Sequence, residues 1–268
     1  MVVVRPMPED QTPIAHFPMT VSPVLSTIDH DPSSLHDVAQ RNWLLAALPR
    51  LELERILPLL TRVDMSSGMS ISEANTRITQ VYFVLTGIIS MVSEMREGTV
   101  EVSTVGCEGM TGLPIVLGAE TMMSRAFVQV PGEALRMSAS DLLSAMDGSP
   151  KLRSLIYRYV LALYDTTAQH AACNRLHALE ERCARWLLMT HDRVDGDVLF
   201  LKQQFLAEML GVHRPAVTLA AGALQRAGII RYSRGKVTVL DRAALENASC
   251  ECYAIVTRRA EELLADEH

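Results

Sequence analysis

The spacing of hydrophobic residues changes twice along the chain. Residues 43–49 and 51–60 show the three- and four-residue spacing of short helices. From residue 61, short runs of alternating apolar and polar residues are separated by glycines, which predicts a small antiparallel roll or barrel. These runs are Met69–Ile71, Gln80–Leu85, Ile88–Met95, Thr99–Val105, Arg125–Val130 and Ala134–Met137. After Met137 the helical spacing returns.

A long helix is predicted from Pro150 to about Asn174, because Pro150 suits a first helical turn and the apolar spacing continues without a break. Six residues on it alternate in steps of three and four: Ile156, Tyr159, Leu163, Thr166, His170 and Cys173. This seam is typical of a helix that pairs with an identical helix, and we expect a homodimer. A helix that packs on its own domain has the same pattern.

Residues 203–227 predict two short helices joined at Gly211, the residue that adopts a left-handed backbone most easily. Strands are expected at Ile229–Tyr232 and Lys236–Leu240, with a turn between them. A helical hairpin alone also occurs in ordinary protein cores. Two helices followed by a strand hairpin are a winged helix, whose second helix enters the major groove of DNA.

The winged-helix segment differs in charge from the rest of the chain. The 268 residues carry a net charge of −6, but residues 199–240 hold six Lys or Arg against one acidic residue, a net of +5, which leaves −11 elsewhere. A basic module on an acidic body suits a localised contact with DNA phosphates. With 49% hydrophobic residues, the chain can also bury a sizeable core.

Cysteine usage and hydropathy predict a cytoplasmic protein with no membrane partner. The five cysteines are scattered, as expected in a reducing compartment. The chain has no run long enough for a membrane span, and prolines and acids interrupt any N-terminal apolar segment. Cys250-Glu251-Cys252 is too short for a zinc site of its own, and we interpret it as part of a final helix over Arg242–Ala265 or as a reactive thiol.

Four segments then resemble the cyclic-AMP receptor protein/Fnr (Crp/Fnr) family of bacterial transcription regulators. They are YFVLTG at 82–87, GCEGMTGLP at 106–114, RCARWLL at 182–188 and LAEMLGVHRPAVTLAAGALQRAGII at 206–230. The resemblance implies an α+β fold with an N-terminal antiparallel β-roll of the cyclic-nucleotide-binding kind, a long dimerisation helix and a C-terminal winged helix-turn-helix.

The domain boundaries follow from these elements. We expect a disordered arm at 1–37, the β-roll sensor domain at 38–149, the dimerisation helix and hinge at 150–178, and the DNA-binding domain with its C-terminal helix at 179–268. The partners implied are double-stranded DNA, a second copy of the chain and, for an activator, RNA polymerase.

The resemblance also implies roles for residues of the winged helix. His213, Arg214, Ala216 and Thr218 occupy the base-reading start of the second helix, where Arg214 suits guanine. Pro215 and Leu219 replace residues that read bases in the best-known member, which predicts a different target sequence. Phosphate contacts are assigned to Lys202, Gln203, Arg231, Arg234 and Lys236.

The match to the family is weaker in the predicted β-roll, where an effector would bind. The possible effector pocket would comprise Gly109, Met110, Met122, Arg125 and Thr167. Methionines stand where cyclic-nucleotide binders carry polar residues, and Arg125 is three positions from the expected arginine, on the other face of its strand. The sequence therefore disfavours a cyclic nucleotide and predicts a more apolar effector or none, with no cofactor, metal or catalytic residue assigned.

Other functions remain open at this point. A haem held by His170 or His177 is conceivable, although histidines on such a seam usually serve in packing. The chain also fits a small-molecule sensor that acts through protein contacts rather than DNA. An enzyme is disfavoured, because the sequence has no Walker loop, no GxSxG, no HExxH and no paired carboxylates.

Overall fold

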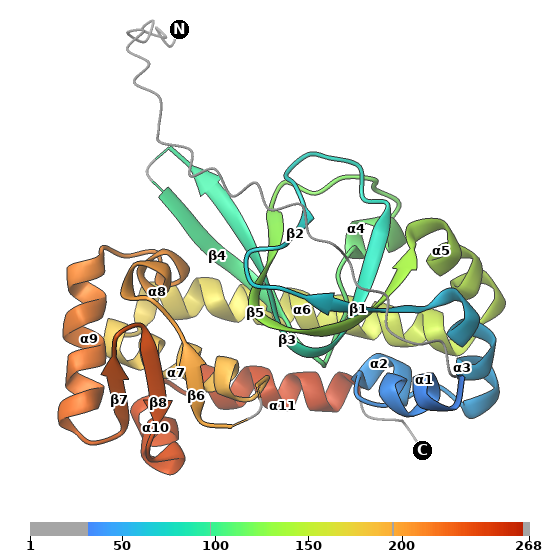
Figure 1. Cartoon of the computed structure of the whole chain (residues 1–268). Coiled ribbons are helices and arrows are strands. Elements are labelled where there is room, and N and C mark those ends of the chain that lie inside the picture. Colours follow the sequence, from blue (N-terminus) through green and yellow to red (C-terminus); the bar gives the residue numbers. More distant parts are fainter. Residues whose placement is uncertain (1–31, 97, 195, 265–268) are drawn as a thin grey trace, which may run out of the picture.

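The computed structural model describes residues 32–96, 98–194 and 196–264. It contains a β-roll flanked by helices, a long helix behind the roll, and a winged-helix domain at one end (Figure 1). This is the mixed α and β architecture expected from the sequence.

The roll is one antiparallel sheet in the order β1-β5-β3-β4, with β2 also paired to β5. Its strands are β1 (Thr61–Met65), β2 (Ser70–Ser72), β3 (Gln80–Met95), β4 (Gly98–Val105) and β5 (Arg125–Ser138). β3 and β5 each join two of the predicted runs. The strands bend at Gly87 instead of ending, because Gly87 has a φ of 82° and a Cβ there would lie 2.5 Å from the Val130 carbonyl oxygen.

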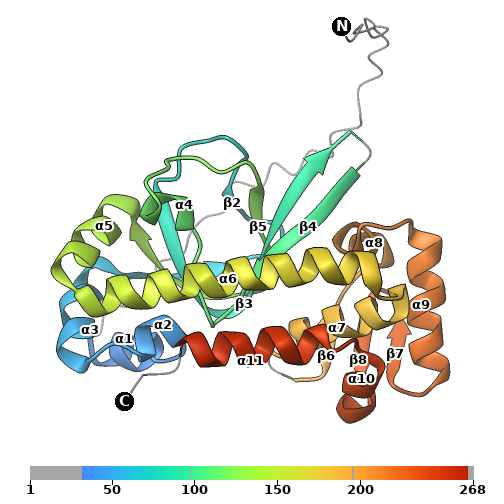
Figure 2. The same cartoon turned by 180° about the vertical axis from the view of Figure 1, so that it is seen from behind.

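Helices close one end of the roll and cross its back. The short ones are α1 (Pro32–Ala39), α2 (Trp43–Ala46), α3 (Arg50–Ile56), the 3-10 turn η1 (Leu57–Leu59), α4 (Leu113–Val116) and α5 (Ala139–Gly148). The long helix α6 (Pro150–Leu176) crosses the back of the roll and lies in the foreground of Figure 2, which views the molecule from behind. Leu152, Leu155 and Ile156 of α6 join Phe83 and Leu135 of the sheet in one buried cluster. Burial of this apolar face fixes the helix against the roll.

The described structure begins with a helix inside the predicted arm at 1–37. Residues 1–31 lie outside the described part of the chain, but residues 32–37 belong to α1. Leu35 and Val38 pack against the core of the roll, which accounts for the helical start of this segment.

The winged-helix domain comprises α7 (Leu179–His191), β6 (Val198–Phe200), α8 (Gln203–Leu210), α9 (Arg214–Arg226), β7 (Ile230–Ser233) and β8 (Lys236–Val239). The predicted hairpin is present, and β6 adds a third strand in the order β6-β8-β7. Gly211 ends α8 with a φ of 64°, and Ala207 is buried where α8 meets α9. The small side chain permits the close crossing of the two helices.

The predicted C-terminal helix is two helices, α10 (Arg242–Ala248) and α11 (Cys252–Leu264). The chain turns at Ser249–Glu251, and α11 then lies alongside α6 (Figure 2). Cys250 and Cys252 therefore do not sit in one continuous helix, which corrects the sequence interpretation.

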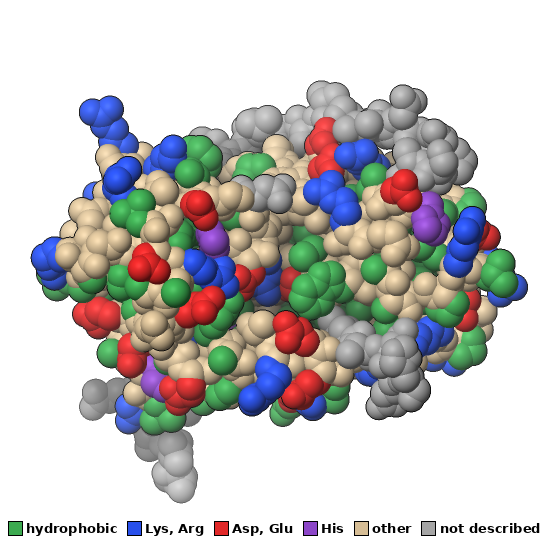
Figure 3. Space-filling model, turned by 90° about the horizontal axis from the view of Figure 1, so that it is seen from below, with side chains coloured by type: hydrophobic (Ala, Val, Ile, Leu, Met, Phe, Trp, Pro, Cys, Tyr) green, Lys and Arg blue, Asp and Glu red, His purple; other side chains and the backbone are tan. Residues whose placement is uncertain are grey.

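Within 32–96, 98–194 and 196–264, no helix is both long and apolar enough to cross a membrane. Acidic and basic side chains are interspersed over the face seen in Figure 3. This pattern is that of a solvated surface.

Candidate nucleic-acid interface

The start of α9 presents its predicted base-reading residues to solvent. His213, Arg214 and Thr218 are exposed and Ala216 is half-buried, whereas Val217 on the opposite face is fully buried. The apolar stripe of α9 holds the helix against the domain core, so its polar stripe faces outward. α9 lies at the outer end of the molecule (Figure 1).

The backbone at the start of α9 also suits an anion. His213 is the N-cap in an extended conformation, and in the described structure its side chain does not cap the helix. Pro215 lies in the first turn, where a missing N–H costs nothing. The Ala216 amide of this turn donates to the His213 carbonyl oxygen at 3.0 Å, and the positive end of the helix dipole attracts a phosphate.

One side-chain contact joins the two helices of the motif. The hydroxyl of Thr218 donates to the side-chain oxygen of Gln203 at 3.0 Å and lies 3.1 Å from the Arg214 carbonyl oxygen. The amide nitrogen of Gln203 is the end suited to a phosphate oxygen. The contact fixes a predicted base-reading residue and a predicted phosphate contact relative to each other.

The wing carries exposed cations on a tight turn. Arg231, Arg234 and Lys236 are exposed, as is Lys202 before α8. Arg234 and Gly235 have φ values of 51° and 75°, the two-residue turn that matches the twist of a hairpin. A left-handed arginine is strained by about 1–2 kcal/mol. Strain of this kind gathers at functional sites, which is consistent with a contact made by Arg234.

A buried carboxylate joins the winged helix to the roll. Glu101 on β4 accepts hydrogen bonds from Trp186 Nε1 at 2.8 Å and from Ser90 Oγ at 2.7 Å. Burial raises the pKa of Glu101 to about 7, although Trp186, Ser90 and nearby Arg193 act in the opposite direction. Sequence reasoning missed this contact, because residues 101 and 186 share no local pattern.

A second ionic contact links the same two parts. The Arg193 guanidinium binds the Glu108 carboxylate at 2.9 Å through Nη2 and at 3.1 Å through Nε, and both side chains are largely buried. Burial opposes ionisation, but Arg193 overcomes it and lowers the pKa of Glu108 below its ordinary value. The contacts Trp186–Glu101 and Arg193–Glu108 thus hold the winged-helix domain to the roll, and each pairs a carboxylate with a hydrogen-bond donor.

The structure does not bring the five predicted effector residues into one pocket. Met110 is fully buried and, with Met122, lines a roll cavity of 30 Å³, about the size of one water molecule. Gly109 lies against the Tyr159 ring. Arg125 instead pairs with Glu94 at 3.1 Å, and Thr167 is exposed on α6. A nucleotide does not fit this cavity.

A larger cavity of 350 Å³ lies outside the roll. It is lined by residues of the roll, α2, α6, α7 with the turn after it, and α11, among them Glu108, Tyr159, Met189, Arg193 and Val256. Its volume falls in the range of small-molecule pockets. No sequence pattern marks it, because its walls come from five separate segments of the chain.

The predicted seam on α6 faces inward. Ile156 and Tyr159 are buried in the roll core with Leu163 packed against it, and Cys173 is buried beside Cys250. Thr166 lines the larger cavity, and His170 is half-buried, where burial and Arg185 lower its pKa to about 3. These six residues contact their own chain, so the seam as assigned is not a free surface.

A winged helix-turn-helix joined by a long helix to an antiparallel roll is the architecture of a Crp/Fnr-type transcription regulator. Residues 181–248 match the Crp-like helix-turn-helix domain. The C-terminal domain therefore belongs to that family, and the chain has the fold of the Crp/Fnr regulators, as the resemblance in its sequence implied. No curated protein matches the sequence.

Solved structures support the fold assignment over most of the chain. A Crp/Fnr-family protein from Eubacterium rectale is 19% identical, covering 76% of this chain and 96% of its own, with a TM-score of 0.61. The c-di-GMP-responsive global regulator CLP of Xanthomonas campestris is 17% identical, covering 71% and 99%, with a TM-score of 0.57. FixK2 of Bradyrhizobium japonicum is 18% identical, covering 71% and 98%, with a TM-score of 0.53.

Proposed function

We propose that this protein binds a specific sequence of double-stranded DNA as a homodimer in the cytoplasm and regulates transcription there. The observation that carries the proposal is the solvent-facing start of α9 beside a basic wing. The net charge of +5 over residues 199–240 lies on a chain that is acidic elsewhere. Phosphate contacts would position the domain, and α9 would read the bases.

Specific roles follow from the chemistry of the exposed residues. Arg214 suits a guanine, whose O6 and N7 accept two hydrogen bonds from one guanidinium. Leu219 is 69% exposed on the same helix, and an exposed leucine suits the methyl group of thymine. Arg231, Arg234, Lys202 and the amide of Gln203 would contact phosphates.

The dimer would form through an exposed stripe of α6. Tyr157, Leu161 and Tyr164 are 48%, 42% and 70% exposed, and with Ala168 and Ala171 they repeat the four- and three-residue steps of a heptad. This stripe lies on the face of α6 that the roll does not cover. Two copies joined along it would present two reading heads to two half-sites about 34 Å apart.

Oligomeric state tests the stripe directly. A Leu161→Glu variant should run as a monomer in sedimentation experiments, because a charge in a heptad core disfavours pairing. Thr166→Glu, on the inward face, is the matched control for the predicted seam. If only Thr166→Glu dissociates the dimer, and circular dichroism shows that this variant is folded, then the predicted seam is the dimer interface instead of the exposed stripe.

A cyclic nucleotide is not part of the proposal, because the roll cavity holds about one water. Small-molecule control, where it operates, would act through the 350 Å³ cavity between the roll, α7 and α11. A ligand there would touch Arg193 and Glu108, the contact that holds the winged helix to the roll. For an activator, RNA polymerase would be the protein partner.

Selection of bound fragments from a random DNA pool, with the full-length protein, tests the function. The expected result is a pseudo-palindrome with half-sites one helical turn apart. The observed binding constant should fall by roughly 0.9 log unit per contacted phosphate for each tenfold rise in salt. Failure to enrich any sequence, with salt-independent capture of a protein partner, would favour the alternative of a sensor that acts through protein contacts.

A further inference from the structure

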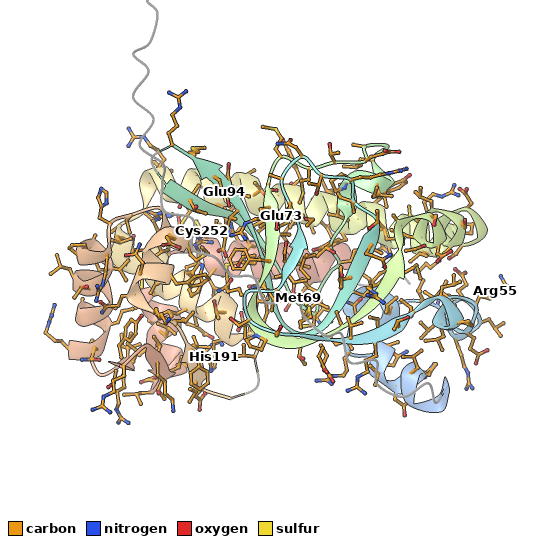
Figure 4. All side chains as sticks on the ribbon, turned by 45° about the horizontal axis from the view of Figure 1, so that its top comes forward. Arg55, Met69, Glu73, Glu94, His191 and Cys252 are labelled. Carbon is orange, nitrogen blue, oxygen red and sulfur yellow. The ribbon has the colours of Figure 1, made fainter. Side chains whose placement is uncertain are left out.

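Four metal-ligating side chains meet near the hinge between α6 and the winged helix. Among the described residues, Cys173, His177, Cys250 and Cys252 bring three sulfur atoms and one ring nitrogen within 4.8 Å of one another. The three cysteines are buried and form a small cluster apart from the main cores. Cys252 is labelled in Figure 4, where it lies within the outline of the molecule.

Two distant segments supply these groups for simple geometric reasons. Cys173 lies in the last turn of α6 and His177 is its C-cap, whose backbone N–H donates to the Cys173 carbonyl oxygen at 3.1 Å and so keeps the two residues close together. Cys250 lies in the turn between α10 and α11, and Cys252 is the first residue of α11. The Tyr253 N–H donates to the Cys250 carbonyl oxygen at 3.2 Å, and this tight turn keeps the two cysteines close together.

The distances suit a tetrahedral ion. Cys173 Sγ lies 3.5 Å from Cys250 Sγ, and His177 Nδ1 lies 3.4 Å from Cys252 Sγ. Ligands at zinc's usual bond lengths, at tetrahedral angles, are about 3.8 Å apart for two sulfurs and about 3.6 Å apart for sulfur and nitrogen. These two distances are thus close to those of a tetrahedral zinc site, and all four ligand atoms lie within 4.8 Å of one another.

The hydrogen bonds around the cluster orient its ligands. His177 Nε2, the nitrogen that points away from the sulfurs, lies 3.2 Å from the Glu251 carboxylate. Gln169 Nε2 donates to Cys252 Sγ at 3.1 Å. A carboxylate on the second nitrogen of a ligating histidine, and a donor to a ligating sulfur, are typical supports of a metal site.

We propose that Cys173, His177, Cys250 and Cys252 form a structural zinc site that fastens the start of α11 to the end of α6. Three soft sulfurs and an imidazole in a tetrahedral set select Zn²⁺, and four protein ligands leave no open position for catalysis. Binding would release three thiol protons to solvent, giving a site of net charge −1.

The surroundings accommodate that charge and connect it to the reading head. The Arg182 guanidinium is close enough to interact electrostatically with Cys173 and Cys250. Its Nη2 donates to the Leu210 carbonyl oxygen, at the end of α8, at 2.7 Å. The zinc site thus stabilises the hinge from which the helix-turn-helix extends.

Metal analysis of the purified full-length protein tests the proposal. We expect about one zinc per chain by mass spectrometry, and at least a tenfold loss of bound zinc in Cys250→Ser or Cys252→Ser. Cys107→Ser, which changes a half-buried cysteine outside the cluster, is the matched control and should retain the metal. A wild-type protein that contains no zinc and binds none on titration would overturn the site.

Two further measurements keep the test sharp if the cysteine variants fold poorly. Co²⁺ added to the wild-type chain should give the thiolate charge-transfer and tetrahedral absorption bands, and Glu251→Gln should weaken zinc binding about 10–100-fold with the fold intact. A Cys173–Cys250 disulfide in non-reducing peptide maps of freshly purified protein, or octahedral cobalt spectra, would contradict the proposal.

Discussion

The winged-helix domain and the β-roll of this chain differ in the surfaces that they expose to a partner. The start of α9 exposes Arg214 and Thr218 on a helix held rigidly by a buried face. In the roll, Met110 is fully buried and the remaining cavity measures 30 Å³. The proposed DNA-reading surface is thus open to solvent, whereas the part of the roll around Met110 is filled by packing.

The difference shows which interactions depend on the partner and which on the chain. DNA presents the same phosphates and base edges to every reader, so the exposed residue types of a winged helix stay recognisable. An effector has no fixed chemistry, so the residue types of the roll do not identify one. Glu101 and Glu108 of the roll instead contact Trp186 and Arg193 next to the winged helix.

The largest expected effect comes from breaking the ion pair between Glu108 of the roll and Arg193, which follows α7 of the winged-helix domain. Arg193→Met leaves the Glu108 carboxylate buried without its partner, which should destabilise the protein by about 3–5 kcal/mol. Thermal unfolding measures the loss. The double variant Arg193→Met/Glu108→Gln should recover much of it, because no buried charge is then unpaired. Equal stability of the two variants would contradict the pairing.

A smaller effect is expected from Glu101→Gln, and it depends on pH. The pKa of Glu101 rises from 4.5 to about 7 on folding, so between these values the folded chain keeps a proton that the unfolded chain has lost. Wild-type stability relative to Glu101→Gln should therefore fall as pH rises from about 5 to 7, by about 2–3 kcal/mol in total. Chemical denaturation of both proteins across this range measures the difference. A pH-independent difference would place Glu101 in solvent instead of the contact.

At the DNA end, Arg214→Ala should weaken binding to the selected site by about 1–3 kcal/mol and relax preference at one base position. Lys236→Ala, in the wing, is the matched comparison. It should weaken binding evenly across sequences and reduce the salt slope by about 1. Fluorescence anisotropy with the selected site and its single-base variants distinguishes the two. If the Arg214→Ala variant keeps the base preference of the wild-type protein, Arg214 does not read a base.

The smallest effect is expected at the roll. Cyclic AMP or cyclic GMP should not shift the melting temperature of the full-length protein or its affinity for DNA, because a cavity for one water does not admit a nucleotide. A rise in melting temperature with either nucleotide would show that the roll binds it and would contradict this prediction.

Much of the DNA end could be predicted from the sequence. The turn at Gly211, the apolar stripe through Val217 and Leu224 and the hairpin beyond them are local patterns, and the structure has each of them. β6 was missed, because three residues carry too little pattern to identify a strand. The base-reading and phosphate assignments remain predictions.

The sequence by itself determined the elements, since helix and strand periods, caps and glycine turns act over a few residues. Only the tertiary structure decided which face of α6 is covered, because the seam of Tyr159 and Cys173 and the stripe of Tyr164 fit the same heptad pattern. It also decided that Cys250 and Cys252 meet Cys173 and His177, about 75 residues earlier in the chain. Contacts at that separation follow from how α11 packs on α6, and no local spacing encodes them.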